Sequence, residues 1–259
     1  MRNSVPAGTL RPTRTFTAPT TGGGVVTVED RDHTRPFLLL HGGGGPATVA
    51  GFADLLAQRT HSRVLTPTHP GFAGTPRVPG LDSTRALAAA YVGLLDELGL
   101  ADVTVIGNSF GGWLAAEIAL LGSPRVSGAV IVDGIGIEVE AHPVTSVAGL
   151  TPAELSKLSY HDPSKAPAAG GGTGPGPDIQ ALVSYTGPAM ADPTLLDRLR
   201  TLDDLPVHVV WGESDGIVST EYGKAYAAAI PTAKFTVLPR SGHLPQIETP
   251  EELLGAITD

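Results

Sequence analysis

The sequence lacks cysteine altogether and lacks an excess of positive charge. With no cysteine among 259 residues, disulfides and thiolate metal sites are excluded. The formal net charge is −9, whereas proteins that bind nucleic acid usually carry a basic surface. We therefore expect neither a structural metal held by sulfur nor a nucleic-acid partner.

Long uncharged apolar runs are also missing, so the sequence predicts no membrane-spanning segment. The first fifteen residues include basic side chains but no apolar stretch after them, which is unlike a secretory signal. We expect a cytoplasmic protein with no membrane partner. The histidines His69, His142 and His161 lack the paired or helical spacing of a zinc site, so no metal is expected.

What the sequence does contain is a regular alternation of apolar strands and helical stretches. Its hydrophobic content of 41% is enough for a sizeable core. Strands are predicted at 13–17, 25–29, 37–40, 64–66, 103–106, 129–133, 207–211 and 235–238. Helices are predicted at about 49–59, 84–98, 113–121, 222–229 and 251–257. This alternation indicates an α/β protein with a mostly parallel central sheet of about eight strands, flanked by helices.

A serine stands on a glycine-bounded turn between a predicted strand and a predicted helix. The turn reads Gly107-Asn108-Ser109-Phe110-Gly111, with a glycine two residues on either side of the serine. This is the pattern of a nucleophile elbow, in which a strained turn exposes the serine hydroxyl. The next N–H, that of Phe110, would lie at the helix N-terminus, where an oxyanion can be held.

Candidates for a base and an acid follow in the chain. Asp215 lies in a loop just past the predicted strand at 207–211, and His243 lies in a loop past the strand at 235–238. Open α/β sheets place their chemistry at these strand ends. The order Ser109, Asp215, His243 is that of the α/β-hydrolases. Asp133, at the end of another strand, is the alternative acid.

A glycine run follows the strand at 37–40 and reads His41-Gly42-Gly43-Gly44-Gly45. Such a run exposes backbone N–H groups without side chains in the way, so it is a candidate for a second oxyanion donor. A phosphate-binding loop is the competing interpretation. It is weak, because no Gly-Lys-Ser/Thr ending and no Gly-x-Gly-x-x-Gly spacing is present.

The interval between Asp133 and Val207 breaks the alternation. Thr151, followed by proline and then by Glu154, predicts a helix start with a capping box. A second helix start is predicted near Asp192. The glycine- and proline-rich segment at 170–177 has too little apolar surface to pack, so we expect it to move. A surface excursion without a role is the alternative interpretation of the whole interval.

Together these motifs resemble the α/β-hydrolase family, specifically its small microbial serine hydrolases with a cap. The matching segments are LLLHGGGGP (38–46), THPGFAGT (68–75), VIGNSFGG (105–112), VVWGESDGIV (209–218) and LPRSGHLPQIETPEEL (238–253). One departure is Thr68, where many relatives carry Asp.

The resemblance assigns roles to the motif residues. It implies that Ser109 is the nucleophile, His243 the base and Asp215 the acid that orients it. It implies oxyanion donors at Gly43 and Phe110. It also implies a helical cap inserted after the sixth strand, at 136–199, on a core domain of 1–135 and 200–259. We expect this cap and its surroundings to line the substrate pocket, with the candidates Phe72, Tyr160, Tyr185 and Met190.

The expected activity is hydrolysis of a carboxylic ester, thioester or lactone of a small organic substrate through an acyl-enzyme on Ser109. No cofactor is required, and a monomer or homodimer is expected. A carbon–carbon bond hydrolase or a cofactor-free non-hydrolytic enzyme of the same fold is the alternative. A ligand-binding protein with a vestigial triad is a further one.

Overall fold

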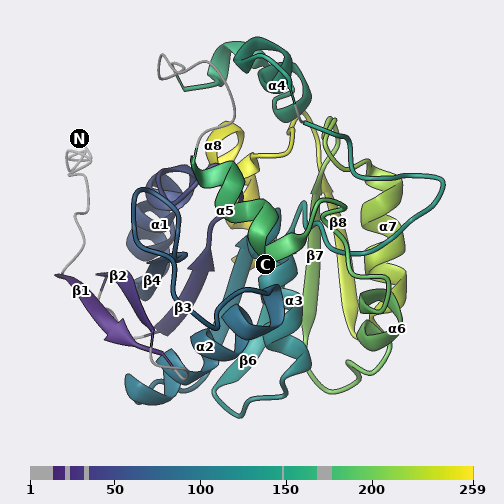
Figure 1. Cartoon of the computed structure of the whole chain (residues 1–259). Coiled ribbons are helices and arrows are strands. Elements are labelled where there is room, and N and C mark those ends of the chain that lie inside the picture. Colours follow the sequence, from purple (N-terminus) through teal and green to yellow (C-terminus); the bar gives the residue numbers. More distant parts are fainter. Residues whose placement is uncertain (1–13, 21–23, 32–34, 148, 168–176, 259) are drawn as a thin grey trace, which may run out of the picture.

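The computed structural model describes residues 14–20, 24–31, 35–147, 149–167 and 177–258, and within them the predicted strands form one sheet (Figure 1). The strands are β1 (Arg14–Pro19), β2 (Val25–Arg31), β3 (Arg35–Leu40), β4 (Ser62–Thr68), β5 (Val103–Asn108), β6 (Val126–Val132), β7 (Val207–Gly212) and β8 (Ala233–Leu238). All eight predicted strands are therefore confirmed, although Thr13 and the turn at 21–23 lie outside the described residues.

The strand order is β1-β2-β4-β3-β5-β6-β7-β8. The strands from β4 to β8 pair in parallel, while β1 and β2 form an antiparallel edge. Parallel neighbours have their carboxyl ends at the same side of a sheet, so the loops after β3, β5, β6, β7 and β8 meet there. This edge carries the candidate site.

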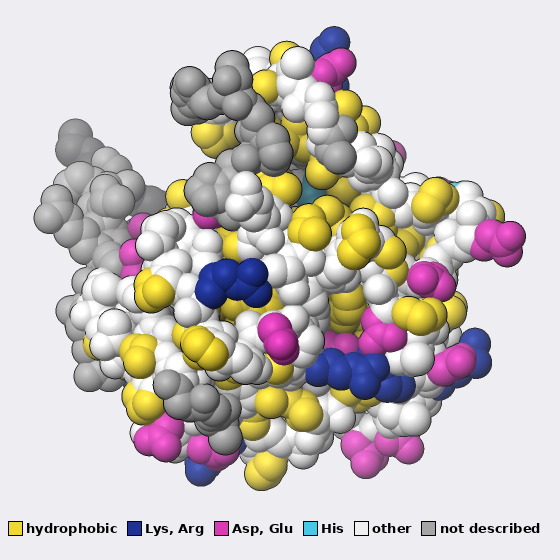
Figure 2. All heavy atoms as spheres, viewed as in Figure 1, with side chains coloured by type: hydrophobic (Ala, Val, Ile, Leu, Met, Phe, Trp, Pro, Cys, Tyr) yellow, Lys and Arg dark blue, Asp and Glu magenta, His cyan; other side chains and the backbone are white. Residues whose placement is uncertain are grey.

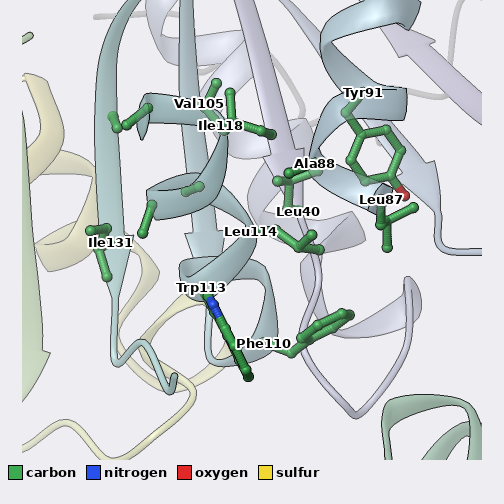
Figure 3. Packing of buried hydrophobic residues seen from close by; sticks show 14 of the residues in the cluster. Leu40, Leu87, Ala88, Tyr91, Val105, Phe110, Trp113, Leu114, Ile118 and Ile131 are labelled. Atoms are coloured by element: carbon green, nitrogen blue, oxygen red, sulfur yellow. The ribbon is translucent and has the colours of Figure 1, made fainter. Parts of the chain in front are cut away.

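Helices cover both faces of the sheet, as the alternation predicts. They are α1 (Ala47–Thr60), α2 (Thr84–Glu97), α3 (Phe110–Leu120), α7 (Thr220–Ala229), α8 (Pro245–Glu248) and α9 (Pro250–Thr258). One core cluster joins α2, α3 and α7 to the sheet, and a second joins α1 and α9 to it. In β3, Leu38 and Leu40 belong to the first cluster and Leu39 to the second, because successive strand residues point to opposite faces. Figure 3 shows Leu114 of α3 next to Leu40 of β3.

Helix α3 begins earlier than the sequence predicts. The sequence predicts a start at Trp113, but the helix begins at Phe110, directly after Ser109. Two consecutive glycines disfavour a helix intrinsically, yet here they are required by packing. A Cβ on Gly111 would lie 2.2 Å from the carbonyl oxygen of Leu40, and one on Gly112 would lie 2.7 Å from the Cα of Gly134. Close approach of α3 to the sheet therefore outweighs the propensity.

Between β6 and β7 the chain leaves the sheet and forms α4 (Pro152–Ser159), the 3-10 turn η1 (Pro163–Lys165), α5 (Pro177–Thr186) and α6 (Leu195–Leu199). The predicted capping box is present: the Thr151 hydroxyl accepts from the Glu154 N–H, and the Glu154 carboxylate accepts from the Thr151 N–H. Of the glycine- and proline-rich segment, residues 170–176 lie outside the described residues, and Pro177 begins α5. Figure 1 shows α4 standing above the sheet and α5 crossing in front of it.

No helix in the described part of the chain is both long enough and apolar enough to cross a membrane.

Candidate active site

The candidate nucleophile lies on a strained turn. Ser109 connects β5 to α3 with a φ of 57° and a ψ of −115°, a conformation that a residue with a side chain rarely adopts. The turn is held by the Ser109 N–H, which donates to the Val132 carbonyl of β6 at 2.9 Å. A Cβ on Gly107 would lie 1.9 Å from the Gly111 carbonyl oxygen, so only glycine fits there. This local geometry matches the predicted elbow.

The candidate base and acid are in direct contact. His243 Nδ1 lies 2.7 Å from Asp215 Oδ2, and both residues are buried. The other carboxylate oxygen of Asp215 accepts from the backbone N–H groups of Ile217 and Val218, at 2.7 and 3.0 Å. A carboxylate with these partners accepts rather than donates, so His243 Nδ1 carries the proton. Its Nε2 is then the atom that can accept a proton.

Asn108, next to the candidate nucleophile, ties the elbow to the histidine loop. Its side-chain amide donates to the His243 carbonyl at 2.8 Å, and its side-chain oxygen accepts from Gln246 Nε2 at 3.0 Å. All these partners are buried. No local pattern indicates these roles for Asn108 and Gln246, because their pairing joins residues far apart in the chain.

Asp133, the alternative acid, faces a different partner. Its Oδ1 accepts from the Gly212 N–H at 2.7 Å, and its Oδ2 is buried without a hydrogen-bond partner among the described residues. Burial, and then the nearby charge of Asp215, raise the pKa of the Asp133 carboxyl well above its ordinary value. The contact with His243 is made by Asp215 and not by Asp133.

The two expected oxyanion donors lie on either side of the elbow. Phe110 is the first residue of α3, so its N–H has no partner inside the helix. The Gly43 N–H makes no hydrogen bond within the described residues. The loop that carries Gly43 touches the elbow, since a Cβ on Gly42 would lie 2.9 Å from the Ser109 Cβ. From the other side, Leu182 of α5 covers Gly43.

Three of the four pocket candidates, Phe72, Tyr185 and Met190, belong to the first core cluster or pack against it. Phe72 and Tyr185 stack on Phe110, with ring centroids 6.4 and 5.7 Å away. Tyr160 follows α4 and lies against Gly242. Met190 sits in the bend after α5. Figure 2 shows hydrophobic side chains around the gap beneath α4. A separate polar cleft of about 560 Å³ lies between η1 and the start of the histidine loop, lined by His161, Asp162, Pro163, Lys165, Pro239, Arg240, Thr249 and Glu252.

The buried Glu248 was missed by the sequence-based reasoning. Its carboxylate accepts from three backbone N–H groups, those of His161, Asp162 and Gly242, at 3.0, 2.7 and 2.8 Å. The same part of the insertion is hydrogen-bonded to the loops that carry the candidate acid and base, because the His243 N–H donates to the Ser159 carbonyl and the Gly216 N–H donates to the Leu158 carbonyl. The insertion therefore holds both loops that carry the candidate acid and base.

In the described ranges, no group of three or more histidine, aspartate or glutamate side chains is arranged to hold a metal ion.

Comparison with known proteins covers most of the chain. A model of the alpha/beta hydrolase family matches residues 37–256. The 2-hydroxymuconate semialdehyde hydrolase of Pseudomonas putida is 27% identical over 248 residues, covering 86% of this chain and 86% of that protein. The 2-hydroxy-6-oxo-6-phenylhexa-2,4-dienoate hydrolase of Burkholderia cepacia is 25% identical over 268 residues, with the same coverage of both chains.

Solved structures share the architecture. The meta-cleavage product hydrolase from Pseudomonas fluorescens IP01 superposes with a TM-score of 0.76 at 22% identity, covering 93% of this chain and 95% of that one. A thermophilic esterase from Thermogutta terrifontis gives 0.67 at 24% identity, covering 95% and 97%. The sheet order, the elbow between β5 and α3 and the family match agree: this chain belongs to the alpha/beta hydrolase family.

Proposed function

We propose that this hydrolase cleaves a carboxylic ester, thioester or lactone of a small organic substrate through an acyl-enzyme on Ser109. The observation that carries the proposal is the linked set of residues at the sheet edge. His243 Nδ1 is hydrogen-bonded to Asp215. The His243 carbonyl accepts a hydrogen bond from the side chain of Asn108, the residue that precedes the strained Ser109. A nucleophile, a base and an orienting acid in this relation support acyl transfer.

In the proposed mechanism, the Ser109 oxygen attacks the substrate carbonyl carbon while His243 Nε2 takes the hydroxyl proton. The charge that develops on the carbonyl oxygen is held by the N–H groups of Gly43 and Phe110. The carbon–oxygen or carbon–sulfur bond to the leaving group then breaks, and His243 gives its proton to that group. Water, deprotonated by His243, attacks the acyl carbon, and the proton returns to Ser109 as the acid leaves. Asp215 keeps His243 in the Nδ1-protonated tautomer throughout.

A carbon–carbon bond hydrolase is the second candidate. It is favoured by the likeness to proteins named as hydrolases of 2-hydroxymuconate semialdehyde and of a phenylhexadienoate. Against it stands the likeness to the thermophilic esterase, which is of similar extent. The same residues serve both reactions. The two reactions differ in the bond that breaks at the attacked carbonyl carbon, which is carbon–oxygen or carbon–sulfur in the first and carbon–carbon in the second.

The test compares two substrate panels on the parent protein and two serine variants. One panel holds nitrophenyl esters of increasing acyl length, and the other holds a 2-hydroxy-6-oxo-dienoate. We expect ester hydrolysis and labelling by a fluorophosphonate in the parent, and neither in Ser109→Ala. Ser127→Ala, at an exposed serine on β6, is the matched control and should behave as the parent. Turnover of the dienoate alone would favour the second candidate, and a parent that never labels would refute both.

A further inference from the structure

Two buried histidine rings lie behind the glycine loop. His41 directly follows β3 and His69 directly follows β4, and neither side chain is exposed to solvent. Their ring centroids are 3.7 Å apart. Each ring carries two nitrogen atoms that require partners when buried, because an unpaired buried polar atom is costly. The partners of all four nitrogens are present and fix the proton positions.

The hydrogen bonds allow one tautomer for each ring. His41 Nε2 accepts from the backbone N–H of His69 at 3.1 Å, so His41 Nδ1 carries the proton and donates to the Gly42 carbonyl at 2.8 Å. His69 Nε2 lies 2.9 Å from the His41 carbonyl, which can only accept, so Nε2 carries that proton. His69 Nδ1 then accepts from the Tyr91 hydroxyl. A second proton on either ring would face another donor.

Both rings are therefore neutral. Burial lowers the pKa of His41 to about 4, against a smaller opposing effect of its bond to Gly42. Burial, and then the neighbouring His41, lower the pKa of His69 well below its ordinary value. Aromatic rings surround the pair: Phe72 and Phe110 meet His69 edge to face, with centroids 5.6 and 5.4 Å away. Neither ring has a solvent-exposed side toward which it could rotate.

The two donated hydrogen bonds hold the backbone of the glycine loop. The carbonyls of His41 and Gly42 belong to the peptide groups on either side of Gly42, and each accepts from an imidazole N–H. The Gly42 carbonyl also accepts from the Gly45 N–H at 3.2 Å. The peptide plane that contains the Gly42 carbonyl also contains the Gly43 N–H, which points the opposite way. Fixing that carbonyl therefore fixes the direction of the Gly43 N–H, and the loop is pressed against Ser109 at Gly42.

We propose that the stacked pair of His41 and His69, held in one tautomer by Tyr91, positions the Gly43 N–H for the oxyanion. This inference rests on the proposed function, in which Gly43 is an oxyanion donor. His69 and Tyr91 are positioning residues, since they act through the loop rather than on the substrate. Loss of a whole oxyanion donor costs on the order of 10²–10³ in rate, so a misdirected donor should cost roughly 10- to 100-fold.

The kinetic test uses three variants, with nitrophenyl butyrate and a fluorophosphonate as probes. His69→Leu removes the bond to the His41 carbonyl and the ring on which the His41 imidazole stacks, so the group that holds the Gly42 carbonyl loses its support. This variant should lower kcat and the labelling rate by roughly 10- to 100-fold, with KM unchanged. His69→Gln presents an amide N–H near the position of Nε2 and should recover most of that loss. His208→Leu changes a half-buried histidine on β7 and should match the parent.

The second test is independent of activity and follows the imidazole nitrogens by ¹⁵N NMR. His41 should be protonated at Nδ1 and His69 at Nε2, and both should stay neutral at pH 6. An imidazolium at pH 6, or the opposite tautomer in either ring, would overturn the inference. An active parent whose His69→Leu variant keeps full kcat overturns the inference alone. A parent that neither hydrolyses nor labels overturns the proposed function and this inference with it.

Discussion

Removing the Glu248 carboxylate should destabilise the protein far more than removing a neighbouring surface carboxylate. Glu248 is 5% exposed and accepts three backbone hydrogen bonds, which join the insertion to the histidine loop. In Glu248→Ala the Gly242 N–H is left buried without an acceptor. The N–H groups of His161 and Asp162 lie nearer the solvent, so water replaces part of what they lose.

The magnitude follows from these three bonds. A buried donor that loses its partner costs about 1–3 kcal/mol, and a bond to a charged group that water partly replaces costs about 1 kcal/mol. The sum is about 4 kcal/mol, which is a large part of the usual stability of a domain. The His243 N–H donates to the Ser159 carbonyl, in the same part of the insertion that Glu248 holds. We therefore also expect ester turnover to fall in the molecules that remain folded.

Urea denaturation followed by circular dichroism measures the change, and Glu251→Ala is the matched control. The side chain of Glu251 is 56% exposed and pairs with Arg59 at the surface, so its loss should cost less than about 1 kcal/mol. Equal urea midpoints and equal denaturation slopes for Glu248→Ala and Glu251→Ala would refute the reasoning that these three hydrogen bonds hold the insertion to the histidine loop.

Three more outcomes are expected. Asp215→Asn should lower ester turnover on the order of 10⁴-fold, whereas Asp133→Asn should change it only a few-fold because Asp133 faces the Gly212 N–H and not His243; steady-state kinetics with equal losses would contradict this. The pKa of His41 is lowered from 6.5 to about 4, so the unfolded chain binds the extra proton first and stability is lost as the pH falls below about 6.5. Near pH 5.5 this contributes a slope of about 1.2 kcal/mol per pH unit. The raised pKa of Asp133 acts in the opposite sense, so the measurement is the flattening of that slope in His41→Asn, seen by urea denaturation from pH 5 to 7. Arg198→Ala strips a bidentate partner from the buried Glu117 and should lower the free energy of unfolding by about 2 kcal/mol, allowing for the partial exposure of Arg198; an unchanged thermal midpoint would count against it.

The fold was predictable because its signals are local. Runs of β-branched and leucine residues define the strands, and the glycines at 107 and 111 define the turn between β5 and α3. The chain order of the loops that carry Asp215 and His243 was informative for the same reason. The ends of the helices and strands were less predictable. Helix α3 starts at Phe110 because contact with Leu40 outweighs the low helix propensity of glycine, and Leu40 is too far away in the sequence for a local pattern to indicate that contact.

Polar pairs between distant residues were not predictable. His69 and Tyr91 are 22 residues apart, His161 and Glu248 are 87 apart, and Glu117 and Arg198 are 81 apart. His69 and Glu248 lie in segments that resemble the family, but the resemblance assigns no role to them, and each of these residue types is ordinary in a loop or on a helix surface. Their roles follow only from burial and direction in the folded chain. For the same reason, the limits of the predicted cap at 136 and 199 and the four pocket candidates stay predictions.

The strand order has a consequence for how the protein folds and for how it is produced. Strand β3 pairs with β4 and with β5. In the sequence, α1 lies between β3 and β4, and α1, β4 and α2 lie between β3 and β5. Non-local parallel pairing of this kind is slow, and apolar segments such as Leu38–Leu40 remain unpaired while it proceeds. Unpaired apolar strands associate between molecules at high concentration. During rapid synthesis, newly made chains should therefore collect in inclusion bodies, and slower synthesis at low temperature should raise the yield of folded protein.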